Sequence, residues 1–307
     1  MNRIVNPKRK YTHQQMTYDL DSLQKKYPKI LTLDIIGESV DGRSIYAIKL
    51  GEGKQEILIN AAHHAREWLT TNLVMDMIET YCSVVSNDQD VGKYDVKEIL
   101  NKVTIWFIPM VNPDGVTLVQ EGAELFSNRD DLYKWNENQL DFTAWKANIR
   151  GVDLNRQYPA DWEYIHHDPG HPASMNFKGH KPISEPEVKA VYNFVCKHNF
   201  KISLAYHSSG EEIFWKYKSK GKVEQSAKKL ADIVSTKTGY QLIYPSENPS
   251  GGGFTDWFIS NFKRPSFTIE IAPSVGPRPV PLCYYEKIWH ENKEVPLELA
   301  SQLFKCD

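Results

Sequence analysis

Two adjacent histidines and a glutamate follow an apolar run near the start of the chain. The stretch ILINAAHHAREWL, residues 57–69, contains His63, His64 and Glu67. Side chains three or four positions apart in a helical turn point to the same face, so either histidine can share a face with Glu67. Two imidazoles and a carboxylate with one open coordination position form a catalytic zinc site. The spacing alone does not choose between the two histidines.

Polar side chains also follow three later apolar runs. IWFIPMV leads to Asn112 and Asp114, SLAY leads to His207, and SFTI leads to Glu270. In α/β sheets, ligands bind outside the carboxyl ends of the strands, so these groups should converge on one edge. Each group alone also fits a structural role, such as a helix cap or an ion pair. The combination favours a metal centre.

Apolar segments of strand type alternate with segments of helical period along the sequence. We expect strands at residues 31–39, 44–51, 56–62, 102–111, 201–209 and 264–273, and helices at 17–27, 67–85, 184–199, 223–239 and 284–304. The first two strands are expected to form a hairpin. The alternation predicts a single-domain α/β fold, with a mixed, largely parallel sheet flanked by helices on both faces.

Three local patterns add detail to this fold. NPDG at residues 112–115 is typical of a turn. Residues 116–150 are polar and irregular, and a loop of that length in a compact domain is usually functional. Ser184 followed by Glu187 is the pattern of a capping box at a helix start. We expect the long loop and the segment at 160–180 to frame a binding pocket.

Composition excludes several classes of protein. The 307 residues are 41% hydrophobic and 25% charged, with a net charge of -2. This balance gives no general attraction to nucleic acid or to anionic lipid. The sequence has no run typical of a signal peptide and no run of 18 apolar residues, which predicts a cytoplasmic protein without a membrane segment. The four cysteines lie far apart, which argues against a disulfide framework or a thiolate zinc site.

Several motifs together resemble the zinc metallocarboxypeptidase family, the M14 peptidases. In the family's order they are GRSIYAIKLG, HHAREW, NPDG, GVDLNR, YHSSG, GGGFTDW and FTIEI, and they span nearly the whole chain. Within the family, WKANIRGVDLNRQYPADW, GHKPISEPEV and FTIEIAPSVGPRPVP resemble the branch of γ-D-glutamyl-L-diamino acid endopeptidases, which cut bacterial cell-wall peptides. The resemblance implies a carboxypeptidase-like fold.

The resemblance also implies a ligand set and a general base. His64, Glu67 and His207 match the family's ligands for one zinc ion, which makes His63 a neighbour. Glu270 matches the residue that takes a proton from the zinc-bound water and passes it to the leaving amine. The resemblance thus resolves the choice that spacing leaves open.

Substrate-binding roles follow from the same resemblance. Asn155 and Arg156 match the pair that holds the substrate's terminal carboxylate, and Arg66 matches a further arginine on the substrate side. Thr255 occupies the position that sets specificity in the family. It has neither a carboxylate for a basic residue nor the bulk for an aromatic one, which agrees with a diamino acid.

The sequence departs from the family pattern at two points. Where most relatives have an oxyanion-stabilising arginine after a tryptophan, this chain has Lys146, so Lys146 is the first candidate for that role, before Arg150 and Arg129. The mobile tyrosine of the family has no clear counterpart, because Tyr244 comes a few residues early. The loop histidines are expected to be solvated without a second metal: His166, His167, His171 and His180.

We therefore expect one peptidase catalytic domain over residues 1–307, with no propeptide and no signal peptide. The expected activity is zinc-dependent hydrolysis of peptides with a free carboxylate, at γ-D-glutamyl-diamino acid bonds of murein peptides. The alternatives are a general metallocarboxypeptidase that releases single C-terminal amino acids, and an inactive relative that binds zinc or a ligand. The expected partner is a peptide derived from the cell wall, with no nucleic acid and no membrane; the oligomeric state is open.

Overall fold

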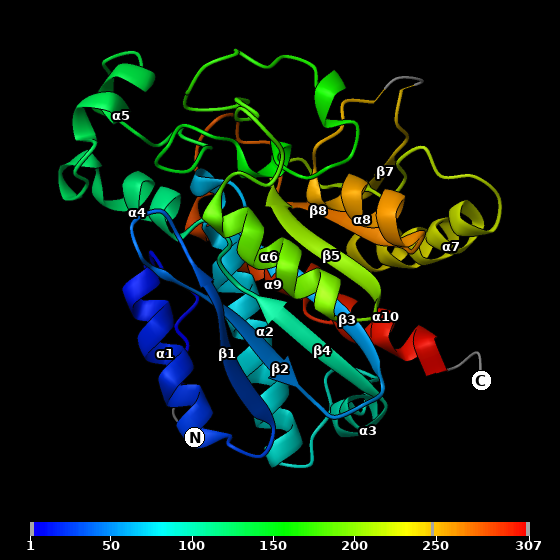
Figure 1. Ribbon diagram of the computed structural model, residues 1–307. Helices are drawn as coiled ribbons and strands as arrows, with labels where there is room; N and C mark the ends of the chain where they lie inside the picture. The colour runs from blue at the N-terminus through cyan, green and yellow to red at the C-terminus, as the bar shows by residue number, and fades with distance from the viewer. Residues whose placement is uncertain (1–2, 247–248, 305–307) are drawn as a thin grey trace.

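One mixed sheet organises the chain. The computed structural model describes residues 3–246 and 249–304 (Figure 1). The strands of the sheet are β1 (Leu31–Glu38), β2 (Ser44–Leu50), β3 (Gln55–Ala61), β4 (Val103–Ile108), β5 (Phe200–Ser208), β6 (Glu212–Phe214), β7 (Gln241–Ile243) and β8 (Ser266–Ile271). They run in the order β1-β2-β4-β3-β5-β8-β6-β7. The central strands β4, β3, β5 and β8 are parallel, while β1, β2 and β6 join antiparallel neighbours.

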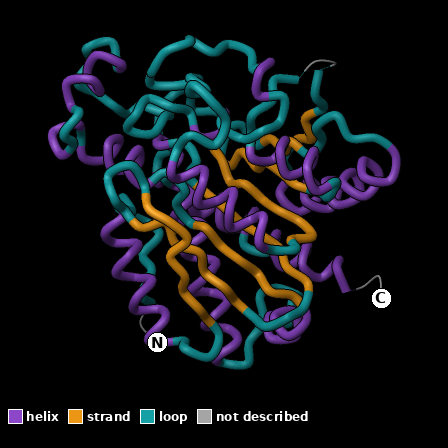
Figure 2. Tube along the Cα trace, in the orientation of Figure 1, coloured by secondary structure: helices purple, strands orange, loops and turns teal. Residues whose placement is uncertain are grey.

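Helices cover both faces of the sheet, as Figure 2 shows. They are α1 (His13–Lys26), α2 (Leu69–Ser86), α3 (Val96–Lys102), α4 (Pro113–Glu121), α5 (Arg129–Trp135), α6 (Pro186–Lys197), α7 (Gly221–Thr238), α8 (Phe254–Phe262), α9 (Tyr285–Asn292) and α10 (Val295–Phe304). In Figure 1, α6 and α8 lie in front of the sheet, and α2 and α9 lie behind it. The predicted single-domain α/β architecture and the hairpin of β1 and β2 are confirmed.

Strand β3 shows why the sequences of the central strands are continuous apolar runs. Ile57 and Ile59 pack into the core shared with α2 and α9, whereas Leu58 packs with α6 and α8 on the opposite face. All three side chains are fully buried. Burial of every side chain stabilises a strand that is covered on both faces, by roughly 1.5–3 kcal/mol for each large apolar side chain. Burial of both faces fixes β3 at the centre of the sheet and points its carboxyl end at the histidines.

Three local expectations are wrong: the turn at NPDG, the long loop at residues 116–150 and the helix cap at Ser184. NPDG begins α4, because Asn112 Oδ1 accepts the backbone N–H of Gly115 at 3.0 Å and Pro113 occupies the first turn. Residues 116–150 are therefore not a continuous loop, since they include most of α4 and all of α5. Ser184 is not a cap, because its hydroxyl donates to the Gln157 side chain at 3.0 Å. Helix α6 begins at Pro186 without a side-chain cap.

The polar groups that follow β4 serve the fold and lie outside the metal cluster. Asn112 Nδ2 donates to the carbonyl groups of His63 and Ala147, both at 3.1 Å. Asp114 is fully buried and pairs with Arg43 at 2.7 Å. Of the predicted polar strand ends, those of β3, β5 and β8 supply candidate site residues, while the end of β4 joins loops together.

Glu187 on α6 is a buried carboxyl group without a cationic partner among the described residues. It accepts weak contacts from the Val40 backbone at 3.3 Å and from Asn148 Nδ2 at 3.4 Å. Burial, with Asp114 and Glu185 nearby, raises the pKa of Glu187 to about 8. The folded protein therefore holds a proton that the unfolded chain releases above its ordinary pKa of 4.5.

The Glu187→Gln variant is therefore expected to gain stability over the wild type as the pH rises. Because the folded pKa is the higher one, the wild type loses stability between the unfolded and folded pKa values, by roughly 2 kcal/mol from pH 5 to pH 7. Urea unfolding at both pH values measures the difference. Glu121→Gln, at an exposed site, is the control. An identical pH dependence in wild type and Glu187→Gln would contradict the prediction.

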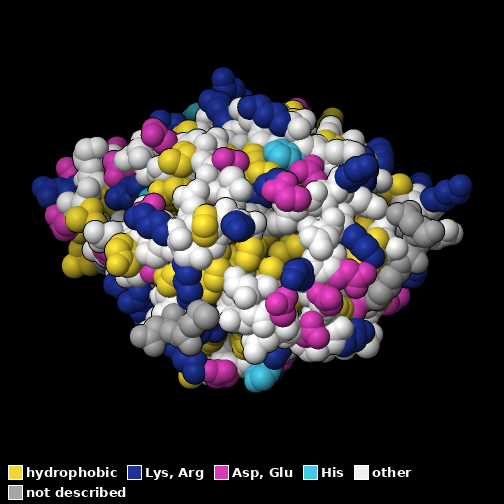
Figure 3. All heavy atoms as spheres, turned by 90° about the horizontal axis from the view of Figure 1, so that it is seen from below, with side chains coloured by type: hydrophobic (Ala, Val, Ile, Leu, Met, Phe, Trp, Pro, Cys, Tyr) yellow, Lys and Arg dark blue, Asp and Glu magenta, His cyan; other side chains and the backbone are white. Residues whose placement is uncertain are grey.

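The surface opposite the loops mixes both signs of charge. Figure 3 views the molecule from below, and the Lys and Arg side chains there alternate with Asp and Glu around smaller apolar areas. Within residues 3–246 and 249–304, every helix is too short or too polar to span a bilayer.

Candidate metal and peptidase site

The segment that follows β3 is held in place by backbone hydrogen bonds. A short 3-10 turn, η1 (Ala65–Glu67), comes four residues after the strand. The N–H groups of Ala65 and Arg66 donate to the carbonyl groups of Lys146 and Trp145, each at 3.1 Å. The loop that carries Lys146 is thereby joined to the turn that carries the predicted metal ligands.

His64, Glu67 and His207 form a compact cluster at the carboxyl ends of β3 and β5. His64 Nδ1 and His207 Nδ1 each lie 2.9 Å from a Glu67 carboxylate oxygen and 3.1 Å from each other. The three residues are at most 4% exposed. Two imidazole nitrogens and a carboxylate that converge in a buried space are the donor set of a catalytic zinc ion. The residues present therefore fit the metal that the sequence implies.

Charge in the cluster also suits a cation. Burial opposes ionisation of Glu67, but His64 and His207 lower its pKa below the usual range. Burial lowers the pKa of His207, so that the neutral imidazole predominates. An ionised carboxylate and neutral imidazoles are the forms that bind metal.

His63 lies beside the cluster and does not join it. Its Nε2 is 3.0 Å from the Tyr158 hydroxyl. Its ring packs near those of His207 and Phe254, and burial holds its pKa well below the usual value. The backbone turn after β3 therefore places the side chain of His64 in the cluster and that of His63 among aromatic residues of the core.

Asp153 is a functional candidate that sequence reasoning missed. Its Oδ1 lies 3.3 Å from His64 Nε2, and its Oδ2 lies 3.7 Å from Lys146 Nζ. Burial favours the protonated acid, but Lys146 and His64 hold the pKa of Asp153 well below its usual range. A carboxylate on the second ring nitrogen orients a metal-binding histidine. The available signal was its place in GVDLNR, two residues before Asn155 of the predicted carboxylate clamp.

Glu270 on β8 lies beside the cluster. The parallel register of β5 and β8 pairs His207 with Glu270. Burial and the nearby Glu67 raise the pKa of Glu270 to about 8, against the opposing effect of Lys146 and Arg66. A carboxylate that holds its proton more tightly than usual is suited to accept a proton and to pass it on.

A cavity of about 400 Å³ opens in front of these groups. Its polar and charged lining includes His64, Lys146, Asn155, Arg156, Lys216, Thr255, Asp256, Thr268 and Glu270. Phe214, Ile243 and Tyr244 contribute apolar surface. The strand ends and the loops between α5 and α6 thus bring most of the predicted site residues to one cavity, on the loop-covered side at the top of Figure 1.

The predicted carboxylate clamp faces this cavity. Asn155 Oδ1 accepts the backbone N–H of Phe254 at 2.9 Å, which leaves its amide N–H groups for a ligand. Arg156 forms no ion pair with any residue of the described chain, and its Nε is buried without a partner. Arg66 lies outside the lining and donates to the Ala144 carbonyl at 2.9 Å.

The three candidate oxyanion partners lie in different surroundings. Lys146 lines the cavity and is mostly buried. Arg150 lies 3.6 Å from Glu185, and Arg129 lies 2.9 Å from Glu124, both with half-exposed side chains. Among the three, the lysine alone lines the cavity, although its catalytic role remains a prediction.

Two further expectations concern tyrosine and histidine in the loops. Tyr244 lines the cavity but is largely exposed, at 61%. Within the described residues, His64, Glu67 and His207 are the one group of three such side chains close enough to share a metal ion. The loop histidines show no second site in that part of the chain.

Comparison with known proteins agrees with this site. The sequence model described as zinc carboxypeptidase matches residues 16–294. The chain belongs to the zinc carboxypeptidase family. A γ-D-glutamyl-L-diamino acid endopeptidase 1 of Lysinibacillus sphaericus is 34% identical over 293 residues, which cover 94% of this chain and 72% of that protein. Mast cell carboxypeptidase A of Homo sapiens is 24% identical over 275 residues, covering 82% of this chain and 60% of that protein.

A solved structure has the same architecture. The crystal structure of thrombin activatable fibrinolysis inhibitor aligns with a TM-score of 0.78 at 20% identity, over 99% of this chain and 77% of that one. The family membership and the His-Glu-His cluster together identify the protein as a zinc metallopeptidase with a site for one zinc ion.

Proposed function

We propose that this zinc metallopeptidase hydrolyses γ-D-glutamyl-diamino acid bonds in murein peptides that end in a free carboxylate. The observation that carries the proposal is Arg156, which faces the cavity of His64 and Glu270 and whose buried Nε has no hydrogen-bond partner in the described chain. A guanidinium binds a carboxylate through two parallel hydrogen bonds, and so fixes the position of the bond to be cut. The similarity to a γ-D-glutamyl-L-diamino acid endopeptidase supports the choice of bond.

Each residue of the cavity has a part in the proposed reaction. Zinc, when bound, polarises the scissile carbonyl and activates water. Glu270 accepts the proton from water and delivers it to the leaving amine. Lys146 supplies positive charge for the developing oxyanion. Asp153 keeps the His64 ring in its orientation.

The main alternative is a carboxypeptidase that releases ordinary C-terminal residues. Thr255 bears on this choice, since its hydroxyl lies 2.8 Å from that of Thr268 and both line the cavity. This polar pair offers no counter-charge for a basic side chain and no apolar bulk for an aromatic one. It therefore favours a polar diamino acid. An inactive binding relative is disfavoured by Glu270, which a binding protein does not need.

The test compares two linkages in the same tripeptide. Zinc-loaded protein is incubated with L-Ala-γ-D-Glu-meso-diaminopimelate and with the isomer joined through the α-carboxyl group of glutamate. The proposal predicts that diaminopimelate is released from the γ-linked peptide alone. Release from α-linked peptides at an equal or higher rate would assign the protein to the general carboxypeptidases. A cytoplasmic location, where such peptides would be recycled cell-wall fragments, remains a prediction from sequence.

The clamp gives a separate prediction for Arg156→Gln. A charge-assisted hydrogen bond contributes about 1.5–3 kcal/mol, so kcat/KM for the tripeptide should fall about 10-fold to 100-fold, mainly through KM. Amidation of the C-terminal α-carboxylate of the tripeptide should lower kcat/KM of the wild type by a similar factor. The two changes together should cost no more than either one, because they remove the same contact. Additive losses would show that Arg156 binds something else.

A further inference from the structure

Lys216 is a cation of the cavity that the proposed reaction does not use. It follows β6 by two residues and lines the cavity together with Arg156 and Lys146. Its side chain is 27% exposed and forms an ion pair with Glu224, in the first turn of α7. The ammonium group of Lys216 therefore lies on the wall that carries β6, and the carboxylate of Glu224 lies beside it without lining the cavity.

The rest of that wall suits the stem of a side chain. Phe214 and Ile243, on the paired strands β6 and β7, are apolar lining residues, and Thr255 and Thr268 are small and polar. The three methylene groups of a diaminopimelate side chain would pack on such a surface, while its charged end would need counter-charges of its own. Lys216 is a cation on this wall, and its ion-pair partner Glu224 lies next to it, outside the residues that line the cavity.

We propose that Lys216 and Glu224 recognise the zwitterionic end of the diamino acid side chain. Lys216 Nζ binds the distal carboxylate, and Glu224 binds the distal ammonium group. This inference rests on the proposed function and adds a determinant of specificity within it. Because a zwitterion brings one charge of each sign, it replaces the internal ion pair without leaving either charge unpaired.

Two tripeptides isolate the contact of Lys216. L-Lysine differs from meso-diaminopimelate only in lacking the distal carboxylate, so L-Ala-γ-D-Glu-L-Lys is the matched substrate. The wild type should prefer the diaminopimelate peptide by about 10-fold to 100-fold in kcat/KM, the range for a charge-assisted hydrogen bond. In Lys216→Gln this preference should fall to within about threefold, through a higher KM for the diaminopimelate peptide with kcat little changed. Lys216→Arg should keep most of it.

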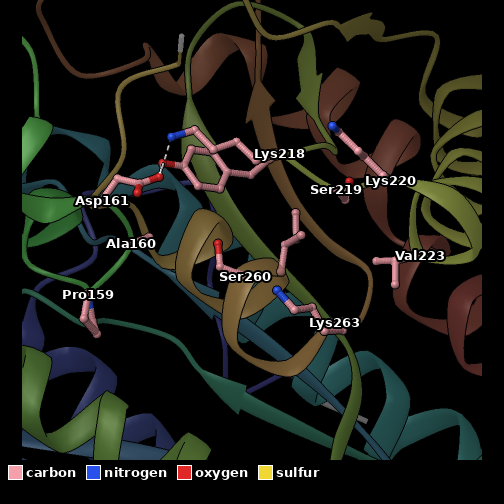
Figure 4. A pocket seen from close by; sticks show the side chains of 11 residues that line it. Pro159, Ala160, Asp161, Lys218, Ser219, Lys220, Val223, Ser260 and Lys263 are labelled. Carbon is pink, nitrogen blue, oxygen red and sulfur yellow. Dashed lines mark hydrogen bonds and ion pairs between the residues drawn. The ribbon is translucent and has the colours of Figure 1, made fainter. Parts of the chain in front are cut away.

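Lys218→Gln is the control variant. Lys218 lies two residues further on and is ion-paired with Asp161 at 2.6 Å, so the variant loses the same charge and a comparable ion pair. It lines a separate pocket of about 510 Å³, shown in Figure 4, with Lys220 and Lys263. Tyr217 is the residue that both cavities share. The preference of Lys218→Gln should match that of the wild type.

The outcomes separate this inference from the proposed function. A wild type that cleaves both tripeptides equally would overturn the role of Lys216 and leave the proposed function standing. A preference retained in Lys216→Gln would overturn it as well. A wild type that cleaves neither peptide would overturn the proposed function, and the inference with it. Calorimetric titration of Glu270→Gln with both peptides gives the same preference as a ratio of dissociation constants, independently of turnover.

Discussion

Glu270→Gln is expected to lower kcat for the tripeptide by about 10²-fold to 10⁴-fold, the usual contribution of general acid–base catalysis. The glutamine keeps the shape of the side chain but accepts no proton at neutral pH. Because Glu270 lies beside the cluster without belonging to it, zinc content and KM should change little. Steady-state kinetics and metal analysis of the same preparation measure both quantities.

Glu211→Gln is a matched control for this variant. Glu211 precedes β6 and is ion-paired with Lys287 outside the cavity, so its loss should leave kcat within about twofold of the wild type. A Glu270→Gln protein with full zinc and nearly full kcat would show that another group moves the proton.

Loss of zinc is the second large effect, and it should follow from His207→Ala or His64→Ala. Either change removes one of three protein ligands. Affinity for zinc should fall by more than about 10²-fold, since even changes to the groups that support ligands cost 10-fold to 100-fold. Competition with a chromophoric chelator measures the affinity, and tripeptide hydrolysis should disappear in parallel.

His63→Gln supplies the contrast, because the two adjacent histidines differ in their contacts. His63 is hydrogen-bonded to Tyr158 and lies outside the cluster, so the zinc affinity of His63→Gln should stay within about tenfold of that of the wild type. The glutamine retains a polar group near the tyrosine hydroxyl. Zinc loss from His63→Gln, with normal zinc in His64→Ala, would reverse the assignment of the ligand.

The central strands and the metal cluster could be predicted from the sequence for one physical reason. Buried parallel strands need apolar residues on both faces, so β3, β5 and β8 read as continuous apolar runs. The polar residues just beyond them must then meet at one edge of the sheet. This rule predicts that His64, His207 and Glu270 belong to the site, although the choice of His64 over His63 needed the family resemblance.

The loops could not be predicted in the same way. Asp153 and Lys146 reach the cluster through long-range backbone bonds, from Asp153 N–H to the Phe177 carbonyl and from Lys146 N–H to that of Ser174, both at 2.8 Å. Such contacts leave no periodic pattern in the sequence. Strands β6 and β7 have three residues each, which is too few for an alternation of apolar and polar residues to show. The position of Lys216 in the cavity therefore could not be predicted either.

The predictions for the starts of two helices were wrong for a related reason. The same residues that favour a turn also favour the first position of a helix, and hydrogen bonds to neighbouring groups decide between the two. Asn112 and Pro113 begin α4 because Gly115 N–H finds the Asn112 side chain. Ser184 has the residue type of a cap, but Gln157 engages its hydroxyl from another loop.

Hydrolysis of the tripeptide in ¹⁸O-labelled water shows which bond the enzyme cuts and whether the cut requires Glu270. The zinc-loaded wild type is incubated with L-Ala-γ-D-Glu-meso-diaminopimelate, and the products are separated by mass. One heavy oxygen is expected in the γ-carboxyl group of the released L-Ala-D-Glu, none in diaminopimelate, and almost no product from Glu270→Gln. Label in the carboxyl group of alanine, or product formed equally well by Glu270→Gln, would contradict this expectation.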